Sequence, residues 1–115
     1  MERGLYTKAW GPSGWVFLHS IAQRYPVSPT EVDKRNAKIF YTSIQTLLPC
    51  KMCRESYAKY IQILPIEYFL SARKDLILWV YIVHNFVNYK LINQGKDIEI
   101  PSLSEIYRKY ENFSS

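Results

Sequence analysis

The chain has 115 residues, enough for one domain with a single core but too few for two. Its apolar content of 48% and aromatic content of 16% exclude a disordered polypeptide. The net charge is +5, but basic residues never occur in runs longer than two, which favours solvated helix faces over a nucleic-acid-binding arm. No apolar stretch reaches the roughly 20 residues of a membrane span, and the N-terminus lacks the apolar core of a signal peptide. We therefore expect one domain over residues 1–115, with no membrane or nucleic-acid partner.

Apolar residues recur at helical spacing through almost the whole chain. A first helix is predicted from about residue 13 to residue 25, and Pro26 ends it. Thr30 then opens a capping box in which Asp33 replaces the usual glutamate, and the helix that follows ends at Pro49.

Three more helices are predicted in the second half of the chain. One runs from residue 49 or 50 to about 64, and a long apolar one runs from about 71 to 93. Ser102 begins another capping box, and a short last helix follows with the apolar stripe Leu103, Ile106, Tyr107 and Tyr110. No period-two pattern indicates a strand. The expected fold is all-α, an antiparallel four-helix bundle with a short fifth helix.

The only two cysteines are Cys50 and Cys53, in the first turn of the third predicted helix. A spacing of three residues on a helix brings both sulfurs to one side, close enough for a disulfide. The free N–H groups and positive dipole end of the helix favour a thiolate in this turn, and Lys51 and Arg54 add positive charge. These features predict a reactive, reversible disulfide.

A zinc site is the first alternative for this cysteine pair, because cysteine and histidine are the usual zinc ligands. The chain offers only His19 and His84, which lie on different predicted helices without the paired spacing of a zinc finger. A thioredoxin-like motif needs flanking strands, for which no pattern exists. Two inert buried cysteines are the last alternative. The pair alone favours redox chemistry.

Two further motifs combine aromatic and hydrogen-bonding groups. The segment 84–88, His-Asn-Phe-Val-Asn, is more polar than a bundle core requires, which favours a polar ligand between helices over a satisfied core histidine. The segment 10–15, Trp-Gly-Pro-Ser-Gly-Trp, is predicted to be a glycine-rich turn that leads into the first helix. Trp15 and His19 then share one helix face and could contact a planar ligand, although an aromatic core anchor is the more common use.

In this order the motifs W-G-x-x-x-W-x-x-x-H, C-x-x-C and H-N-x-V-N resemble the Erv/ALR family of FAD-linked sulfhydryl oxidases, over roughly residues 10–91. The resemblance implies a four-helix bundle that holds FAD at its mouth, usually in a homodimer. It implies that Cys53 lies against the isoalloxazine ring and that Cys50 receives the substrate thiol. It also implies FAD contacts from Gly11, Trp15, His19, His84, Asn85, Val87 and Asn88, from Lys90 near the phosphates, and more loosely from Tyr107.

The chain departs from the family pattern in its cysteines. Tyr81 stands where many members have the first cysteine of a structural disulfide, and no shuttle pair is present. A thiol-containing protein substrate must then reach Cys50 directly or through a separate thioredoxin-like shuttle, with oxygen as the acceptor and hydrogen peroxide as the product. This minimal form is similar to the oxidases of large cytoplasmic DNA viruses, which implies a place in the host cytoplasm or the virion. A helical zinc-binding or adaptor module and a basic nucleic-acid-binding bundle are the alternatives.

Overall fold

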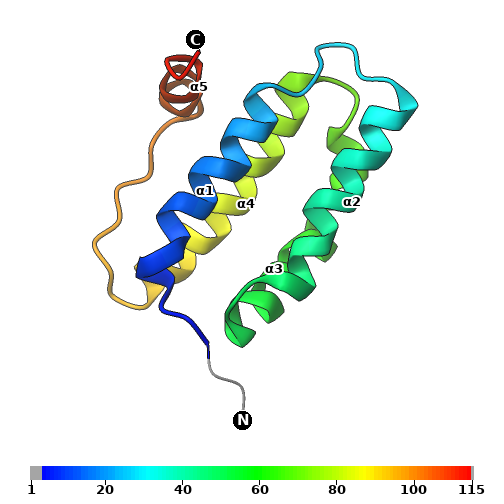
Figure 1. Cartoon of the computed structure of the whole chain (residues 1–115). Coiled ribbons are helices and arrows are strands. Elements are labelled where there is room, and N and C mark those ends of the chain that lie inside the picture. Colours follow the sequence, from blue (N-terminus) through cyan, green and yellow to red (C-terminus); the bar gives the residue numbers. More distant parts are fainter. Residues whose placement is uncertain (1–3, 115) are drawn as a thin grey trace.

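The computed structural model describes residues 4–114, so both ends of the predicted domain, residues 1–3 and 115, lie outside the described residues. Successive long helices run in opposite directions (Figure 1). This arrangement confirms the all-α prediction of a four-helix bundle with a short fifth helix. The elements are α1 (Thr7–Gln23), α2 (Glu31–Leu47), α3 (Lys51–Ile63), the 3₁₀ helix η1 (Ile66–Phe69), α4 (Arg73–Asn93) and α5 (Leu103–Glu111).

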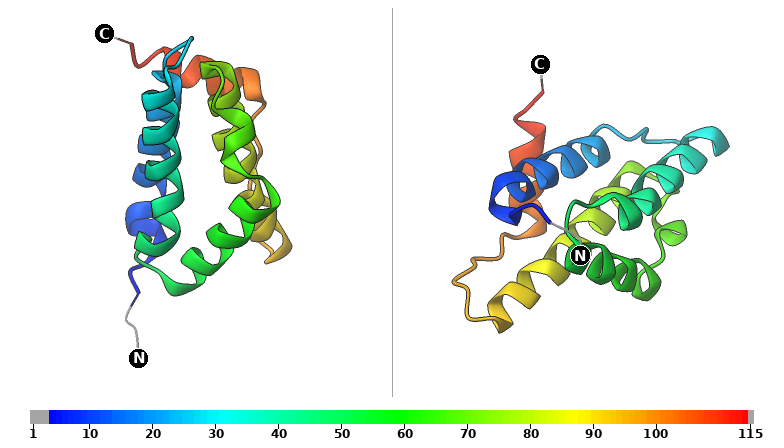
Figure 2. Two further views of the ribbon diagram at one scale, coloured as in Figure 1. Left: turned by 90° about the vertical axis from the view of Figure 1, so that its right-hand side faces the viewer. Right: turned by 60° about the horizontal axis from the view of Figure 1, so that its bottom comes forward.

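The bundle consists of two helix pairs around one core. α1 packs along α4, and α2 contacts α3, which slants away from it in the left view of Figure 2. The largest fully buried side chains of the core are Tyr41, Ile66, Leu76, Trp79 and Val80. The polar atoms of the two buried rings have hydrogen-bond partners. The Tyr41 hydroxyl donates to the carbonyl of Leu18, and the Trp79 indole donates to the carbonyl of Leu64. Among residues 4–114, no helix is both long and apolar enough to cross a bilayer.

Both predicted capping boxes are confirmed. The Asp33 amide donates to the Thr30 hydroxyl at 3.1 Å, and the Thr30 amide donates to the Asp33 carboxylate at 2.8 Å. Ser102 and Glu105 make the equivalent pair at the start of α5. Because these side chains satisfy amides that have no partner within the helix, the starts of α2 and α5 could be read from the sequence.

The predicted start of the first helix was wrong. α1 begins at Thr7, so the expected glycine-rich turn is helical and Pro12 lies inside the helix. A proline near a helix start removes only one backbone hydrogen bond, which the surrounding contacts can offset. At the other end, α1 stops at Gln23 because Tyr25 is held outside it: its hydroxyl donates to the carbonyl of Leu70, and its carbonyl accepts from Arg73.

α5 lies across α1 and α4 and is seen nearly end-on in Figure 1. The Gln23 amide at the end of α1 donates to the Glu111 carboxylate at 2.9 Å, which ties α5 to the bundle. Only part of the predicted apolar stripe of this helix is buried, because Ile106 and Tyr110 face the core while Leu103 and Tyr107 are exposed. A short helix that crosses its neighbours can bury only the positions at the crossing.

Candidate functional site

A stack of four rings forms where α1, α4 and α5 meet. The side chains of His19 and His84 contact each other through Nε2 and Nδ1 at 2.9 Å. Trp15 lies flat on the His84 ring, with 3.9 Å between ring centroids and 6° between planes. Tyr110 lies over His19 at 4.9 Å. We call Trp15, His19, His84 and Tyr110 the imidazole stack.

Burial keeps the two imidazoles of the stack neutral. It lowers the pKa of His19 to about 3, with further lowering by the charges of His84 and Lys109. Burial, followed by Lys109, lowers the pKa of His84 to about 4. When two neutral imidazoles share one hydrogen bond, the pair keeps one N–H donor and one nitrogen acceptor for other groups. The stack therefore combines flat apolar faces with both kinds of hydrogen-bonding group.

The stability of the chain is expected to fall as the pH drops below about 6.5. An unfolded histidine takes up a proton near that pH, whereas His19 and His84 in the folded chain stay neutral until about pH 3 and 4. The unfolded state then binds more protons, so the free energy of unfolding decreases with decreasing pH. Urea denaturation between pH 7.5 and 5.5 measures this slope, and a double variant with glutamine at both positions should have a smaller one. An equal slope in both proteins would contradict neutral burial of the pair.

Two carboxamides continue the polar lining along α4. The Asn88 side chain donates to the Asn85 side chain at 3.1 Å, and both residues are buried. Val87 is half-buried on the same helix. On α1, a Cβ atom added to Gly11 would meet no other atom within 4 Å, so the space beside this glycine is open. The predicted residues of α4 thus include two buried carboxamides that bond to each other, in the two turns that begin at His84.

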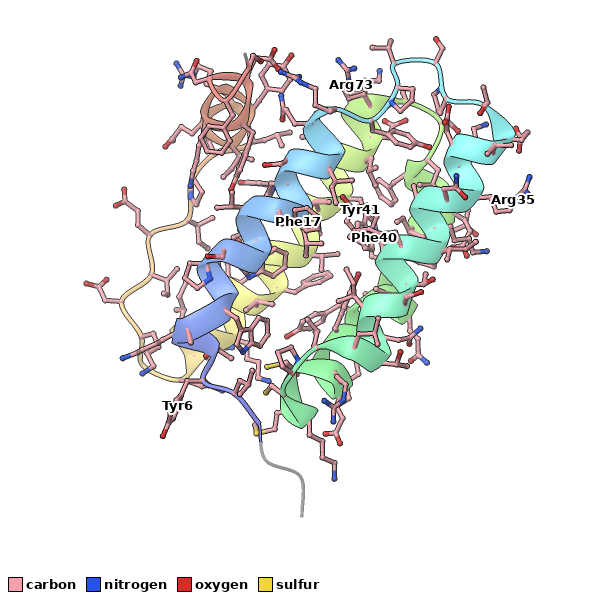
Figure 3. All side chains as sticks on the ribbon, in the orientation of Figure 1. Tyr6, Phe17, Arg35, Phe40, Tyr41 and Arg73 are labelled. Carbon is pink, nitrogen blue, oxygen red and sulfur yellow. The ribbon has the colours of Figure 1, made fainter. Side chains whose placement is uncertain are left out.

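The two cysteines lie at the start of α3. Cys50 is its N-cap residue, and the Cys53 amide donates to the Cys50 sulfur at 3.3 Å. Both residues are half-buried free thiols. The N-terminal segment reaches the same place, because the Leu5 amide donates to the Pro49 carbonyl at 2.9 Å. The sulfur atoms drawn in Figure 3 all appear at the end of the bundle where α3 begins.

The expectation of an easily ionised thiol was wrong for Cys53 in this dithiol form. Burial, followed by the hydrogen bond and the charge of Cys50, raises the pKa of Cys53 to about 11, although Lys90 opposes the shift. A charge is costly to place where water is partly excluded, and the helix N-terminus alone does not offset that cost here. The raised pKa of Cys53 could not be predicted from the sequence, because it depends on how deeply the sulfur is buried.

Lys90 connects α4, the helix that carries His84, with α3, the helix that carries the thiols. Lys90 of α4 donates to the Ser56 hydroxyl of α3 at 2.7 Å, one turn after Cys53. From His84 to Lys90 the helix advances only about 9 Å. A hollow of about 160 Å³ is lined by Tyr110 of the stack but by neither imidazole, and one of about 300 Å³ lies between α1 and α2; neither hollow is lined by the thiols. The case for a site here therefore depends on its groups: flat rings around His84, two carboxamides on α4, and a thiol pair that Lys90 approaches from the same helix.

Two residues of this site were not predicted as such. Tyr110 was assigned to the core of the last helix, although it lies over His19, and Ser56 was not singled out at all. The position of Ser56 three residues after Cys53 was the available signal. Tyr107 stays a prediction: its side chain is 47% exposed.

Within the described part of the chain, no three His, Cys, Asp or Glu side chains group closely enough to hold a metal ion.

Comparison with known proteins identifies relatives of this chain by sequence and by fold. A family model described as Erv1/Alr matches residues 12–110. A probable FAD-linked sulfhydryl oxidase of Acanthamoeba polyphaga mimivirus is 42% identical over 81 residues, which are 70% of this chain and 57% of that protein. The mitochondrial FAD-linked sulfhydryl oxidase of Saccharomyces cerevisiae is 36% identical over 81 residues, 70% of this chain and 42% of that protein. The chain thus spans about half the length of these relatives. A crystal structure of the yeast Erv1 core aligns with a TM-score of 0.84 and 26% identity, covering 98% of this chain and 90% of that one.

Proposed function

Because this chain belongs to the Erv1/Alr family, we propose that it is an FAD-dependent thiol oxidase that forms disulfides in protein substrates. The observation that carries the proposal is that α4 contributes His84 to the imidazole stack and, less than two turns further on, brings Lys90 close to the Cys50/Cys53 pair. Curated relatives from a virus and from yeast mitochondria are named FAD-linked sulfhydryl oxidases.

The groups of the site fit FAD. The flavin and the adenine of this cofactor are flat rings at opposite ends of a long molecule. The site offers flat side-chain faces for such rings, together with hydrogen-bonding groups. The neutral imidazoles can stack on and bond to an adenine, while buried carboxamides can both donate and accept. The residues proposed to hold FAD are Gly11, Trp15, His19, His84, Asn85, Val87 and Asn88, with Cys53 at the isoalloxazine end. Bound FAD would accept the electron pair of the dithiol and pass it to oxygen, which yields hydrogen peroxide.

The cysteines carry out the exchange with the substrate. In the oxidised pair, a substrate thiolate attacks the Cys50 sulfur, a new S–S bond forms, and Cys53 leaves as a thiolate with the electron pair. A second substrate thiolate attacks the substrate sulfur of this mixed disulfide, which releases the oxidised substrate and the Cys50 thiolate. Cys50 suits the first role because it is the N-cap residue of α3. The two residues that follow it, Lys51 and Met52, are exposed, so a substrate can approach this end of the helix.

The partners are also a proposal. A thiol-containing protein reaches Cys50 directly or through a separate thioredoxin-like shuttle, in the host cytoplasm or the virion of a virus. Exposed apolar side chains on α1 and α2 support a homodimer. One of them, Phe17 of α1, is labelled in Figure 3. These side chains are Val16, Phe17, Val32 and Ile39. Sedimentation equilibrium tests for the homodimer, because it measures the mass of the particle in solution.

Oxygen consumption tests the proposed activity. The purified chain is expected to consume oxygen when a small dithiol is added, and to release one hydrogen peroxide for each disulfide formed. Activity should depend on FAD and not on added metal. Bound zinc together with no flavin and no oxygen uptake would instead support a zinc-binding module.

A further inference from the structure

Lys90 does not extend into solvent as most lysines do. This half-buried side chain crosses from α4 to α3, where its ammonium donates to the Ser56 hydroxyl at 2.7 Å. Since a hydroxyl carries no charge, this partner fixes the position of the ammonium without neutralising it. An ammonium group has three N–H donors, and the bond to Ser56 uses one of them.

Ser56 places this charge next to the redox pair. It follows Cys53 by three residues within α3, so the two side chains lie one turn apart on the same face of the helix. In agreement with this placement, the positive charge of Lys90 acts to lower the pKa of Cys53, against the effects of burial and of Cys50. The groups that act on Cys53 thus include Cys50 at the start of the same helix and Lys90 on α4.

Lys90 has a different role in the family resemblance, in which it approaches the cofactor phosphates. In the structure the ammonium is held at the thiol end of the site, against the helix that carries both cysteines.

We propose that Lys90 is a positioning residue for the disulfide chemistry: held by Ser56, it stabilises the Cys53 thiolate that leaves when a substrate thiol attacks Cys50. This inference rests on the proposed oxidase function. The step breaks the Cys50–Cys53 bond and forms a bond between Cys50 and the substrate sulfur, and the electron pair stays on Cys53. A thiol of lower pKa is the better leaving group, so a fixed positive charge beside Cys53 speeds the attack.

Titration of Cys53 in the purified 115-residue chain tests the proposal. A Cys50→Ser background leaves Cys53 as the only cysteine, and mass spectrometry measures its alkylation rate by iodoacetamide as a function of pH. Lys90→Gln is expected to raise the midpoint of this curve by about one pH unit or more. Ser56→Ala should raise it by a smaller amount, because the ammonium remains but is no longer fixed. Lys59→Gln is the matched control: Lys59 is an exposed lysine of α3, and its loss should leave the midpoint unchanged.

Flavin content, measured on the same samples, separates the two roles of Lys90. If Lys90→Gln leaves the midpoint of the alkylation curve unchanged, the proposal is overturned, whether or not flavin is lost. Loss of flavin with an unchanged midpoint would support the phosphate role instead. The proposed oxidase function fails separately, if the parent chain with both cysteines neither binds flavin nor consumes oxygen. The titration itself requires no turnover, so the two failures are distinguishable.

Discussion

Replacing Cys53 with serine is expected to reduce thiol-dependent oxygen consumption by at least about a thousandfold, as the loss of an essential nucleophile does in other enzymes. Without this sulfur the disulfide cannot form, and Cys50 has no partner that can leave with the electron pair. The change should also remove any long-wavelength absorbance that arises from a thiolate next to the flavin. An oxygen electrode and a visible spectrum of the reduced protein measure the two effects.

Cys50→Ser should be equally inactive but spectroscopically different. It removes the sulfur that the substrate attacks, and it leaves Cys53 in place, so the long-wavelength absorbance is retained or enhanced. Met52→Ser is the matched control, because Met52 lies between the two cysteines, is 64% exposed and takes no part in the proposed exchange. The mechanism is contradicted if either cysteine variant consumes oxygen as fast as the wild type.

Replacing His84 with alanine is expected to weaken FAD binding by about tenfold or more, which corresponds to about 1.4 kcal/mol. The change removes the ring that stacks on Trp15 and that bonds to His19. It also deletes one of the few hydrogen-bonding groups of the stack. The flavin retained after gel filtration, and the affinity on titration with FAD, measure the effect.

A His84→Phe variant separates binding from folding. Phenylalanine preserves a flat ring beside Trp15 but removes both ring nitrogens, so the bundle should fold while FAD affinity still decreases. Circular dichroism checks the helix content of both variants. Full flavin retention in well-folded His84→Ala would show that this histidine is only a core residue.

The helices were predictable to the extent that local chemistry determines them. Thr30 and Asp33 mark the start of α2 because the cap is made by side chains adjacent in sequence. The start of α1 was missed because Pro12 and its neighbouring glycines normally interrupt a helix, and only tertiary packing reveals that this one continues. The short helix η1 was missed for a similar reason: Pro65 was taken as a simple stop.

The site was predictable as a set of residues but not as a geometry. Motif order predicted that His19 and His84 serve one ligand, but their direct hydrogen bond depends on how α1 packs on α4. The Lys90 contact with Ser56 likewise depends on the packing of α3 against α4. The high pKa of Cys53 follows from burial, which no local pattern gives.

The visible absorption spectrum of the purified chain is the most direct test of a flavin held next to Cys53. The expected result is a yellow protein with about one FAD per chain, whose flavin bands bleach when a dithiol is added without oxygen and return in air. A colourless protein after refolding with FAD would contradict the account, and so would bound flavin that a dithiol does not bleach.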